Sequence, residues 1–210
     1  LAPDFFFSNC HKWAFAPRGC AVLYVSKPFQ DTIFPAVVSF LGQGETAFQK
    51  RFSYIGTDDI SPLLCFSAGI EFARRICGDA SLRTLQRRNR RLAIEGGRTV
   101  ARIWGTDVLF DDDLETDVTA ECMLVPSMIN VRLPDSALEA FPIPPASKND
   151  DRLKSKGDIG MAMLEKKHIY IPIVVIAGKY YTRLSAQVFL ELSDFEKMAF
   201  DLLDLIKSSS

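Results

Sequence analysis

The residues best suited to chemistry lie near the start of the chain, around a single lysine. An aromatic run, Phe5–Phe7, leads through a short polar stretch to Lys12, and a second apolar run follows at Ala21–Val25. A lysine held between apolar runs loses hydration, which lowers the pKa of its ammonium group and prepares a nucleophilic amine for Schiff-base chemistry. The alternative is an ordinary lysine whose stem packs at a strand end while its charge reaches water.

A second candidate is the pair Gly56-Thr57, which precedes Asp58 and Asp59. Glycine allows a ligand to approach the backbone closely, and a threonine hydroxyl can donate to a phosphate oxygen. Without further context, a Gly-Thr pair is also typical of an ordinary turn.

The third candidate is Arg183, in the aromatic run that begins at Tyr180. A guanidinium group can hold a carboxylate through two parallel hydrogen bonds. The alternative for such a residue is a structural ion pair.

These segments, taken together, resemble one enzyme family. Residues 8–13 (SNCHKW) and 16–25 (APRGCAVLYV) are similar to the cofactor-lysine segment of pyridoxal phosphate-dependent class-V aminotransferases. The likeness is greatest to the isopenicillin N epimerase-like branch, and within it to fungal hercynylcysteine sulfoxide lyase-like proteins. The Gly-Thr-x-Asp pattern at 56–59 resembles the family too, as do residues 183–187 followed by Ser193-Asp194.

The resemblance implies a role for each candidate. Lys12 would attach pyridoxal 5'-phosphate covalently and move a proton at the substrate α-carbon. Thr57 would reach the cofactor phosphate of the neighbouring subunit in a homodimer, with Gly56 beside it. Arg183 would bind the α-carboxylate of an amino-acid substrate. Three further residues would line the cofactor pocket, namely Ser8, Asn9 and His11.

The pattern of apolar residues predicts the elements that position these groups. Continuous apolar runs at 5–7 and 21–25 favour strands covered on both faces. Helices are expected from the cap Ser61 to Gly78, over 81–101, over 158–167, and from Ser193, where Glu196 would complete a capping box. Further strands are expected at 128–134, 169–176 and 180–188, the last two joined by a turn at Ala177-Gly178-Lys179.

The expected fold class is α/β. By resemblance, residues 1–103 form the end of the large cofactor-binding domain of a fold-type-I enzyme, with its linking helix, and residues 104–210 form a small α+β domain. Family members carry a long segment before the cofactor lysine, whereas this chain begins at Leu1 inside a strand. We therefore expect it to be the C-terminal half of a larger enzyme and to be inactive alone.

Composition narrows the class of partner. The 210 residues carry 25 basic and 26 acidic side chains, and this balance favours neither nucleic acid nor a membrane surface. The five cysteines show no metal-site spacing, and the acidic run 111–115 lacks the spacing of a calcium loop, so no metal is expected. The five arginines within 83–91 are interpreted as a solvated helix face. Free thiols and the lack of a secretory leader favour a cytoplasmic protein.

Three functions remain open at this level. The first is a lyase that cleaves the carbon–sulfur bond of a cysteine-derived sulfoxide. The second is another reaction of the same cofactor, such as epimerisation, desulfuration or amino transfer. The third is a non-catalytic remnant that does not bind the cofactor. All residues that distinguish the first two lie outside the segments named above.

Overall fold

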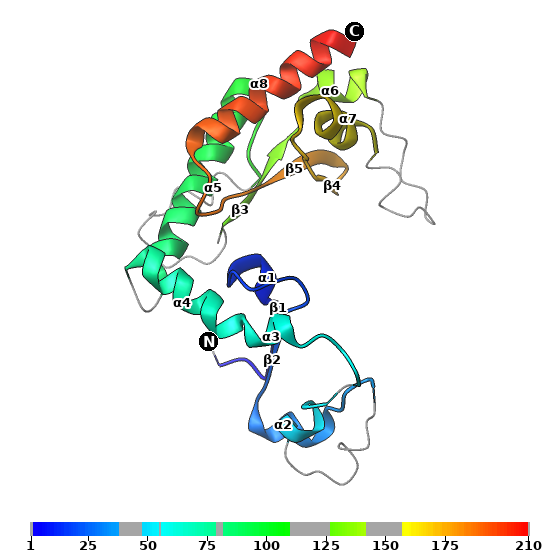
Figure 1. Cartoon of the computed structure of the whole chain (residues 1–210). Helices are drawn as coiled ribbons and strands as arrows, with labels where there is room; N and C mark the ends of the chain where they lie inside the picture. Colours follow the sequence, from blue (N-terminus) through cyan, green and yellow to red (C-terminus); the bar gives the residue numbers. More distant parts are fainter. Residues whose placement is uncertain are drawn as a thin grey trace. The chain divides into compact units, whose positions relative to one another are not determined.

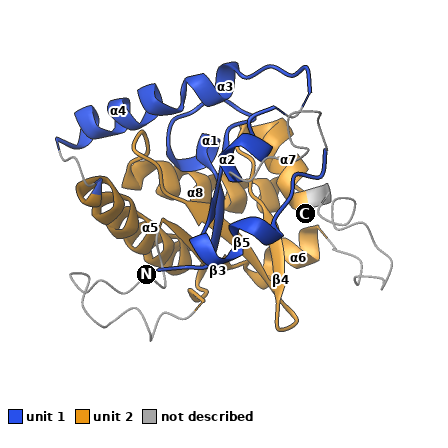
Figure 2. Cartoon of the chain, turned by 90° about the horizontal axis from the view of Figure 1, so that it is seen from below, with its two compact units in different colours: residues 1–82 blue, residues 83–210 orange. Residues whose placement is uncertain are grey.

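The computed structural model describes residues 2–37, 48–54, 56–78, 82–109, 127–141 and 157–209. The chain divides into two compact units, residues 1–82 and 83–210, coloured blue and orange in Figure 2. The acidic run at 111–115 and one of the five cysteines, Cys122, lie outside the described residues. The mixture of helix and sheet confirms the α/β class in its coarse form.

The first unit contains a two-stranded antiparallel sheet and short helices. Its elements are β1 (Phe5–Asn9), α1 (Cys10–Trp13), β2 (Ala21–Val25), the 3-10 helix η1 (Lys27–Thr32), α2 (Phe48–Arg51), α3 (Ser61–Leu64) and α4 (Phe66–Cys77). Strands β1 and β2 pair from Phe5 opposite Val25 to Asn9 opposite Ala21. The predicted strands at the start of the chain are therefore confirmed.

The expectation that both faces of these strands are covered is wrong for the described residues. Phe5 is 46% exposed, Phe6 47% and Phe7 82%, and Leu23 and Tyr24 on the paired strand are also exposed. Successive side chains of a strand point to opposite faces, so the three phenylalanines expose apolar surface on both faces of this ribbon.

The predicted helix from Ser61 to Gly78 is present but divided at Cys65 into α3 and α4. Gly78 ends α4 at φ 64°, the left-handed geometry in which helices commonly finish. The prediction that Ser61 caps this helix is wrong, because the helix begins at Ser61 itself. The carboxylate of Asp59 accepts a hydrogen bond from the Ser61 amide at 2.9 Å, because Ser61 already lies inside the first turn. These contacts with Ser61 lower the pKa of Asp59.

The second unit is a three-stranded antiparallel sheet covered by helices (Figure 1). Its elements are α5 (Arg83–Trp104), β3 (Met128–Arg132), α6 (Asp135–Ala140), α7 (Gly157–Lys167), β4 (Ile173–Ile176), β5 (Lys179–Ser185) and α8 (Leu192–Ser209). The strand order is β3-β5-β4, so β5 is the central strand. Helix α5 packs against both α8 and β3, and α6 and α7 also contact α8.

The core of the second unit lies on one face of this sheet. Ile129, Val131, Thr182 and Leu184 are buried there, and the Thr182 hydroxyl donates to the Pro172 carbonyl at 3.1 Å. The alternate positions, including Asn130 and Arg183, lie on the other face. A buried face and a more open face are typical of an antiparallel sheet. On the more open face Tyr181 is still buried and Asn130 half-buried, but Arg183 is exposed and available for binding.

Helix α5 remains regular through Gly96-Gly97. An added Cβ at Gly96 would meet the Phe195 ring at 2.8 Å, and one at Gly97 would meet Ile129 at 2.8 Å. The glycines therefore let α5 approach α8 and β3 closely, and this packing offsets their low helix propensity. The compact units divide the chain before α5, whereas the domain boundary predicted from the sequence lies after residue 103. The domain assignment for the whole protein stays a prediction.

Helix α8 begins at Leu192 rather than after a Ser193 cap. The reciprocal contact at its start comes from Asp194, whose carboxylate accepts a hydrogen bond from the Glu191 amide at 2.8 Å. The predicted capping box between Ser193 and Glu196 is therefore replaced by a contact that lies two residues earlier. No helix among the described residues is both long and apolar enough to cross a membrane.

The β4–β5 turn yields a stability prediction. Ala177 has φ 48° and Gly178 φ 77°, the two positive values of a type I′ hairpin turn. Alanine in this left-handed conformation costs roughly 1–2 kcal/mol, whereas asparagine tolerates it. We expect Ala177→Asn to raise Tm by about 2–4 °C, measured by calorimetry. Gly178→Ala should have the opposite sign; an unchanged or lower Tm in Ala177→Asn would contradict the assignment of strain.

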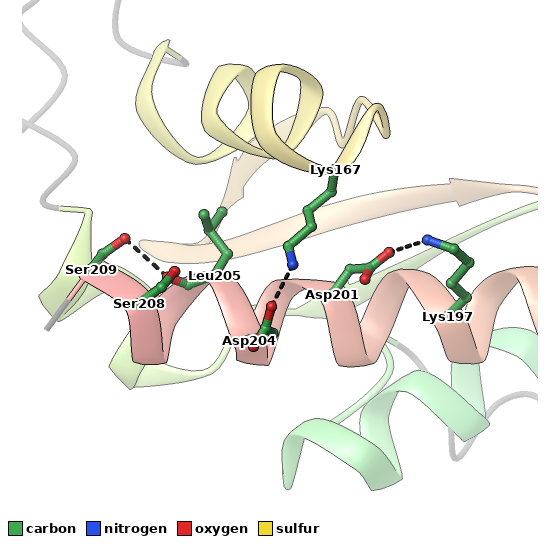
Figure 3. A network of polar contacts seen from close by, with 7 residues as sticks. All are labelled: Lys167, Lys197, Asp201, Asp204, Leu205, Ser208 and Ser209. Atoms are coloured by element: carbon green, nitrogen blue, oxygen red, sulfur yellow. Dashed lines mark hydrogen bonds and ion pairs between the residues drawn. The ribbon is translucent and has the colours of Figure 1, made fainter.

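Polar contacts along α8 tie it to α7 (Figure 3). Lys167, at the end of α7, donates to Asp204, whereas Lys197 and Asp201 pair within α8 itself. The hydrogen bond between the first two residues raises the pKa of Lys167 and lowers the pKa of Asp204. Of these two pairs, Lys167–Asp204 joins two helices, whereas Lys197–Asp201 lies within one.

The direction of these shifts predicts a pH dependence. A lowered folded-state pKa means that Asp204 contributes stability above the usual carboxyl range of about 4, and that this contribution is lost as pH falls. We expect Asp204→Asn to speed hydrogen exchange at the end of α7 slightly near neutral pH, with the difference vanishing near pH 2. The matched control is Asp201→Asn, which breaks the contact with Lys197 inside α8. Because Asp201 acts on Lys167 only through its charge, this variant should affect the end of α7 less than Asp204→Asn does. A difference that grows on acidification would contradict the pairing.

Candidate active site

Four of the predicted site residues lie together where β1 ends and α1 begins. Ser8 and Asn9 are the last residues of β1, and His11 and Lys12 lie in the single turn of α1. Cys10 donates its amide to the Cys20 carbonyl at 2.9 Å, which extends the pairing of β1 with β2 by one step. The strand pairing therefore fixes the turn that carries Lys12.

Lys12 is exposed, with Cys10 and Ala14 buried on the inner side of the turn. The predicted apolar surroundings are thus wrong for the described residues. A four-residue helix buries only the positions that face the neighbouring strand and α4, and Lys12 lies on the opposite side. Its amine is therefore accessible for covalent attachment.

The polar neighbours of Lys12 have defined roles. The Ser8 hydroxyl accepts a hydrogen bond from Trp13 Nε1 at 2.8 Å, so its own proton remains available to an anion. His11 Nδ1 lies 3.3 Å from the Cys20 carbonyl oxygen. Because a carbonyl only accepts, Nδ1 carries the proton, and in the neutral ring Nε2 is an acceptor.

The two thiols below this turn are buried rather than reactive. Cys10 and Cys20 are both free and almost inaccessible. Burial, and then the proximity of Cys20, raise the pKa of the Cys10 thiol. A buried thiol with a raised pKa is a poor nucleophile, so these cysteines act as small apolar residues that support the lysine turn. Cys65 and Cys77 are also free.

Helix α4 packs against the backbone that follows the Lys12 turn. A Cβ added at Gly69 would lie 2.3 Å from the Ala14 carbonyl oxygen and 3.0 Å from the Phe15 carbonyl carbon. Phe15 has φ 54°, a strained value for an aromatic residue, and its ring packs against Phe72 at 5.1 Å between centroids. The close approach of α4 thus holds the backbone just after Lys12 in a conformation that it would not adopt alone.

Gly56 and Thr57 lie on an exposed segment before α3. Gly56 has φ 113°, which favours glycine, and an added Cβ there would meet no atom within 4 Å. Within the described part of the chain, the Thr57 hydroxyl has no hydrogen-bond partner. The segment is open to a ligand, but no described contact joins it to the Lys12 turn. Its role in phosphate binding stays a prediction.

Arg183 occupies the central strand of the second unit, directly opposite Asn130. Its side chain is exposed on the open face of the sheet. Among the described residues no acidic group pairs with it, so the alternative of a structural ion pair has no support here. The guanidinium group is therefore available to bind an anion.

Sequence reasoning missed a positioning role for Arg88. Its guanidinium group donates to the carbonyls of Gln187 at 3.1 Å and Leu190 at 2.9 Å, which lie in the connection between β5 and α8. Other arginines of this helix, such as Arg87 and Arg91, are exposed, as the interpretation of a solvated face predicts. Arg88 also binds the segment that follows the Arg183 strand. The sequence does not indicate this contact, because Arg88 is one of several similar arginines in the same run.

Comparison with known proteins extends the resemblance to nearly the whole chain. The L-cysteine desulfhydrase-like proteins lolT1 and lolT2 of Epichloe uncinata are 35% and 33% identical to it, covering 93% and 98% of this chain but 48% and 49% of the relatives. Hercynylcysteine sulfoxide lyase of Schizosaccharomyces pombe is 26% identical, covering 94% of this chain and 44% of the relative. No protein-family model matches the chain.

The chain thus spans about half the length of the curated relatives that it matches. The likeness to hercynylcysteine sulfoxide lyase expected from residues 8–25 is confirmed as a sequence similarity. The names of the relatives suggest a family of cysteine lyases. Membership of class V stays a prediction.

Proposed function

We propose that this chain is the C-terminal part of a pyridoxal phosphate-dependent enzyme of class V and fold type I. The proposed reaction is cleavage of the carbon–sulfur bond of cysteine or a cysteine-derived sulfoxide. The observation that carries the proposal is the similarity, over 93–98% of the chain, to proteins named L-cysteine desulfhydrase-like.

The groups at the β1–α1 junction suit this cofactor chemically. The accessible amine of Lys12 can bond to an aldehyde, and the Ser8 hydroxyl has a proton to donate to a phosphate oxygen. Asn9 makes no capping hydrogen bond with its side chain, so its amide can donate as well. In our proposal Thr57 adds a hydroxyl donor to the phosphate of a second subunit in a homodimer.

Each residue has a task in the proposed reaction. Pyridoxal phosphate, when bound, supplies the electron sink. Lys12 holds the cofactor and moves the proton at the substrate α-carbon, and Arg183 orients the substrate through its carboxylate. Loss of that proton and of the sulfur substituent on the β-carbon breaks the carbon–sulfur bond. The sulfur substituent departs with the bonding electron pair, and the remaining enamine is protonated and hydrolysed by water, which gives pyruvate and ammonia.

The surface of the first unit supports the proposal that further polypeptide completes this enzyme. The exposed phenylalanines of β1 offer apolar surface on both faces of the ribbon. Monomeric proteins rarely expose a contiguous apolar patch of this kind without a partner. Because the relatives are about twice as long, the proposed cover is the segment that this chain does not match. The 210 residues alone are then expected to turn over little substrate.

Product analysis of the full-length gene product, loaded with pyridoxal phosphate, tests the proposal. With L-cysteine or a cysteine sulfoxide, we expect pyruvate and ammonia in equal amounts together with the released sulfur product. An inverted α-carbon without pyruvate would identify an epimerase, and alanine with enzyme-bound sulfur a desulfurase. No cofactor uptake by the full-length protein would favour the non-catalytic remnant. Each of these three outcomes would contradict the assignment as a lyase.

A further inference from the structure

We infer that Asn130 binds the substrate carboxylate together with Arg183, so that one strand pair supplies a two-residue clamp. This inference deepens the proposed function, since it rests on the assignment of a carboxylate to Arg183. It assigns a new specificity residue, Asn130, from the second unit alone. The substrate class that it selects is an amino acid with a free carboxylate.

The register of the sheet places the two side chains against each other. Asn130 of β3 lies directly opposite Arg183 of β5. The Asn130 carbonyl accepts a hydrogen bond from the Leu109 amide, and the Arg183 amide donates to the Pro172 carbonyl at 3.3 Å. The backbone hydrogen-bonding groups of each residue are therefore directed away from the other residue's strand. The two residues are therefore a non-hydrogen-bonded pair, the arrangement in which the Cα atoms approach to about 4.5 Å and the side chains are closest.

Both side chains are free to bind a ligand. Within the described part of the chain, neither the Asn130 amide nor the Arg183 guanidinium has a side-chain hydrogen bond or an ion pair. The next cation along β3, Arg132, is already paired with Asp107 at 2.7 Å. The unpaired positive charge on this part of the open face therefore belongs to Arg183, with the Asn130 amide as its immediate neighbour.

The chemistry of the pair matches a carboxylate. A guanidinium group donates two parallel hydrogen bonds, which leave lone pairs on both carboxylate oxygens. The NH2 of Asn130 can donate to one of these, approaching from the adjacent strand. A neutral amide adds a donor without a second charge, so the clamp would favour a singly charged carboxylate over an ester or an amide of the same amino acid.

Titration of the 210-residue chain by NMR tests the clamp without cofactor or turnover. The probe is S-methyl-L-cysteine, and its methyl ester serves as the ligand without a carboxylate. We expect the side-chain NH2 of Asn130 and the Nε–H of Arg183 to shift with one shared Kd for the acid, and neither to shift with the ester. Asn130→Leu keeps the shape of the side chain but removes the donor. It should raise this Kd by about tenfold, which is the loss expected for a hydrogen bond to a charged group.

The control variants separate the inference from the proposed function. Val175→Ala, at an exposed position of the same sheet, should leave the Kd unchanged, and Arg183→Leu should abolish binding. If Asn130→Leu binds the acid as well as the unaltered chain does, the inference is overturned while the role of Arg183 stands. If the acid moves neither resonance, both carboxylate assignments fail. Attachment of cofactor to Lys12, measured separately, then decides whether the enzyme class survives.

Discussion

Replacement of Lys12 with alanine is expected to abolish covalent attachment of pyridoxal phosphate to the full-length protein. Lys12 is exposed at the β1–α1 junction, so loss of its side chain removes an amine without opening a cavity. Loss of proton transfer at the substrate α-carbon alone should lower kcat by about 10²–10⁴-fold. Borohydride reduction followed by peptide mass mapping measures attachment, and pyruvate release measures turnover.

The matched control for this prediction is Lys27→Ala. Lys27 is an exposed lysine of the same unit, at the start of η1. Its loss should leave both attachment and turnover unchanged, while circular dichroism should show the same fold for both variants. A cofactor label that persists in Lys12→Ala, or one that spreads evenly over exposed lysines, would remove Lys12 from the proposed mechanism.

The second large effect is expected at Gly69. Alanine favours a helix over glycine by roughly 1 kcal/mol, so Gly69→Ala would stabilise an unobstructed helix. Here the new Cβ would lie 2.3 Å from the Ala14 carbonyl oxygen, a backbone atom that no side-chain rotation can move. Overpacking of this kind commonly costs about 1–3 kcal/mol or more. We therefore expect a net loss of about 2 kcal/mol, opposite in sign to the helix propensity.

Hydrogen exchange of peptides covering residues 5–25 measures this effect where it occurs. A loss of 2 kcal/mol corresponds to exchange about 30-fold faster in the β1–β2 ribbon and the lysine turn. Ser67→Ala, at an exposed position of the same helix, is the control and should change exchange little. Unchanged protection in Gly69→Ala would mean that α4 does not hold the turn. In the full-length protein, the same variant should also weaken cofactor attachment at Lys12.

Much of the local structure is predictable from sequence because it depends on short-range patterns. Strands at Phe5 and Ala21, a helix ending at Gly78 and the hairpin through Ala177-Gly178 all follow from apolar runs and turn residues. The errors lie at strand ends, since the strand predicted from residue 169 begins at Ile173, and at helix starts. Asp59 and Asp194 provide the capping contacts assigned to Ser61 and to the Ser193–Glu196 pair, because several nearby side chains could serve and only the backbone geometry selects one.

The candidate site is also predictable only in part. Its residue types and their order along the chain, from Lys12 through Thr57 to Arg183, suffice for the resemblance to a cofactor family. The burial of these residues was not predictable. The sequence predicted a desolvated Lys12, but apolar neighbours along the chain do not shield a side chain unless the fold brings them over it, and the one-turn helix exposes Lys12.

By itself, then, the sequence determined the candidate residues, the α/β class and most element positions, since residue type and periodicity encode these locally. Only the tertiary structure decided that Gly69 must be small and that Arg88 fixes the connection after β5. It also decided that Asn130 stands beside Arg183. These facts depend on strand register and helix approach, which join residues far apart in the chain.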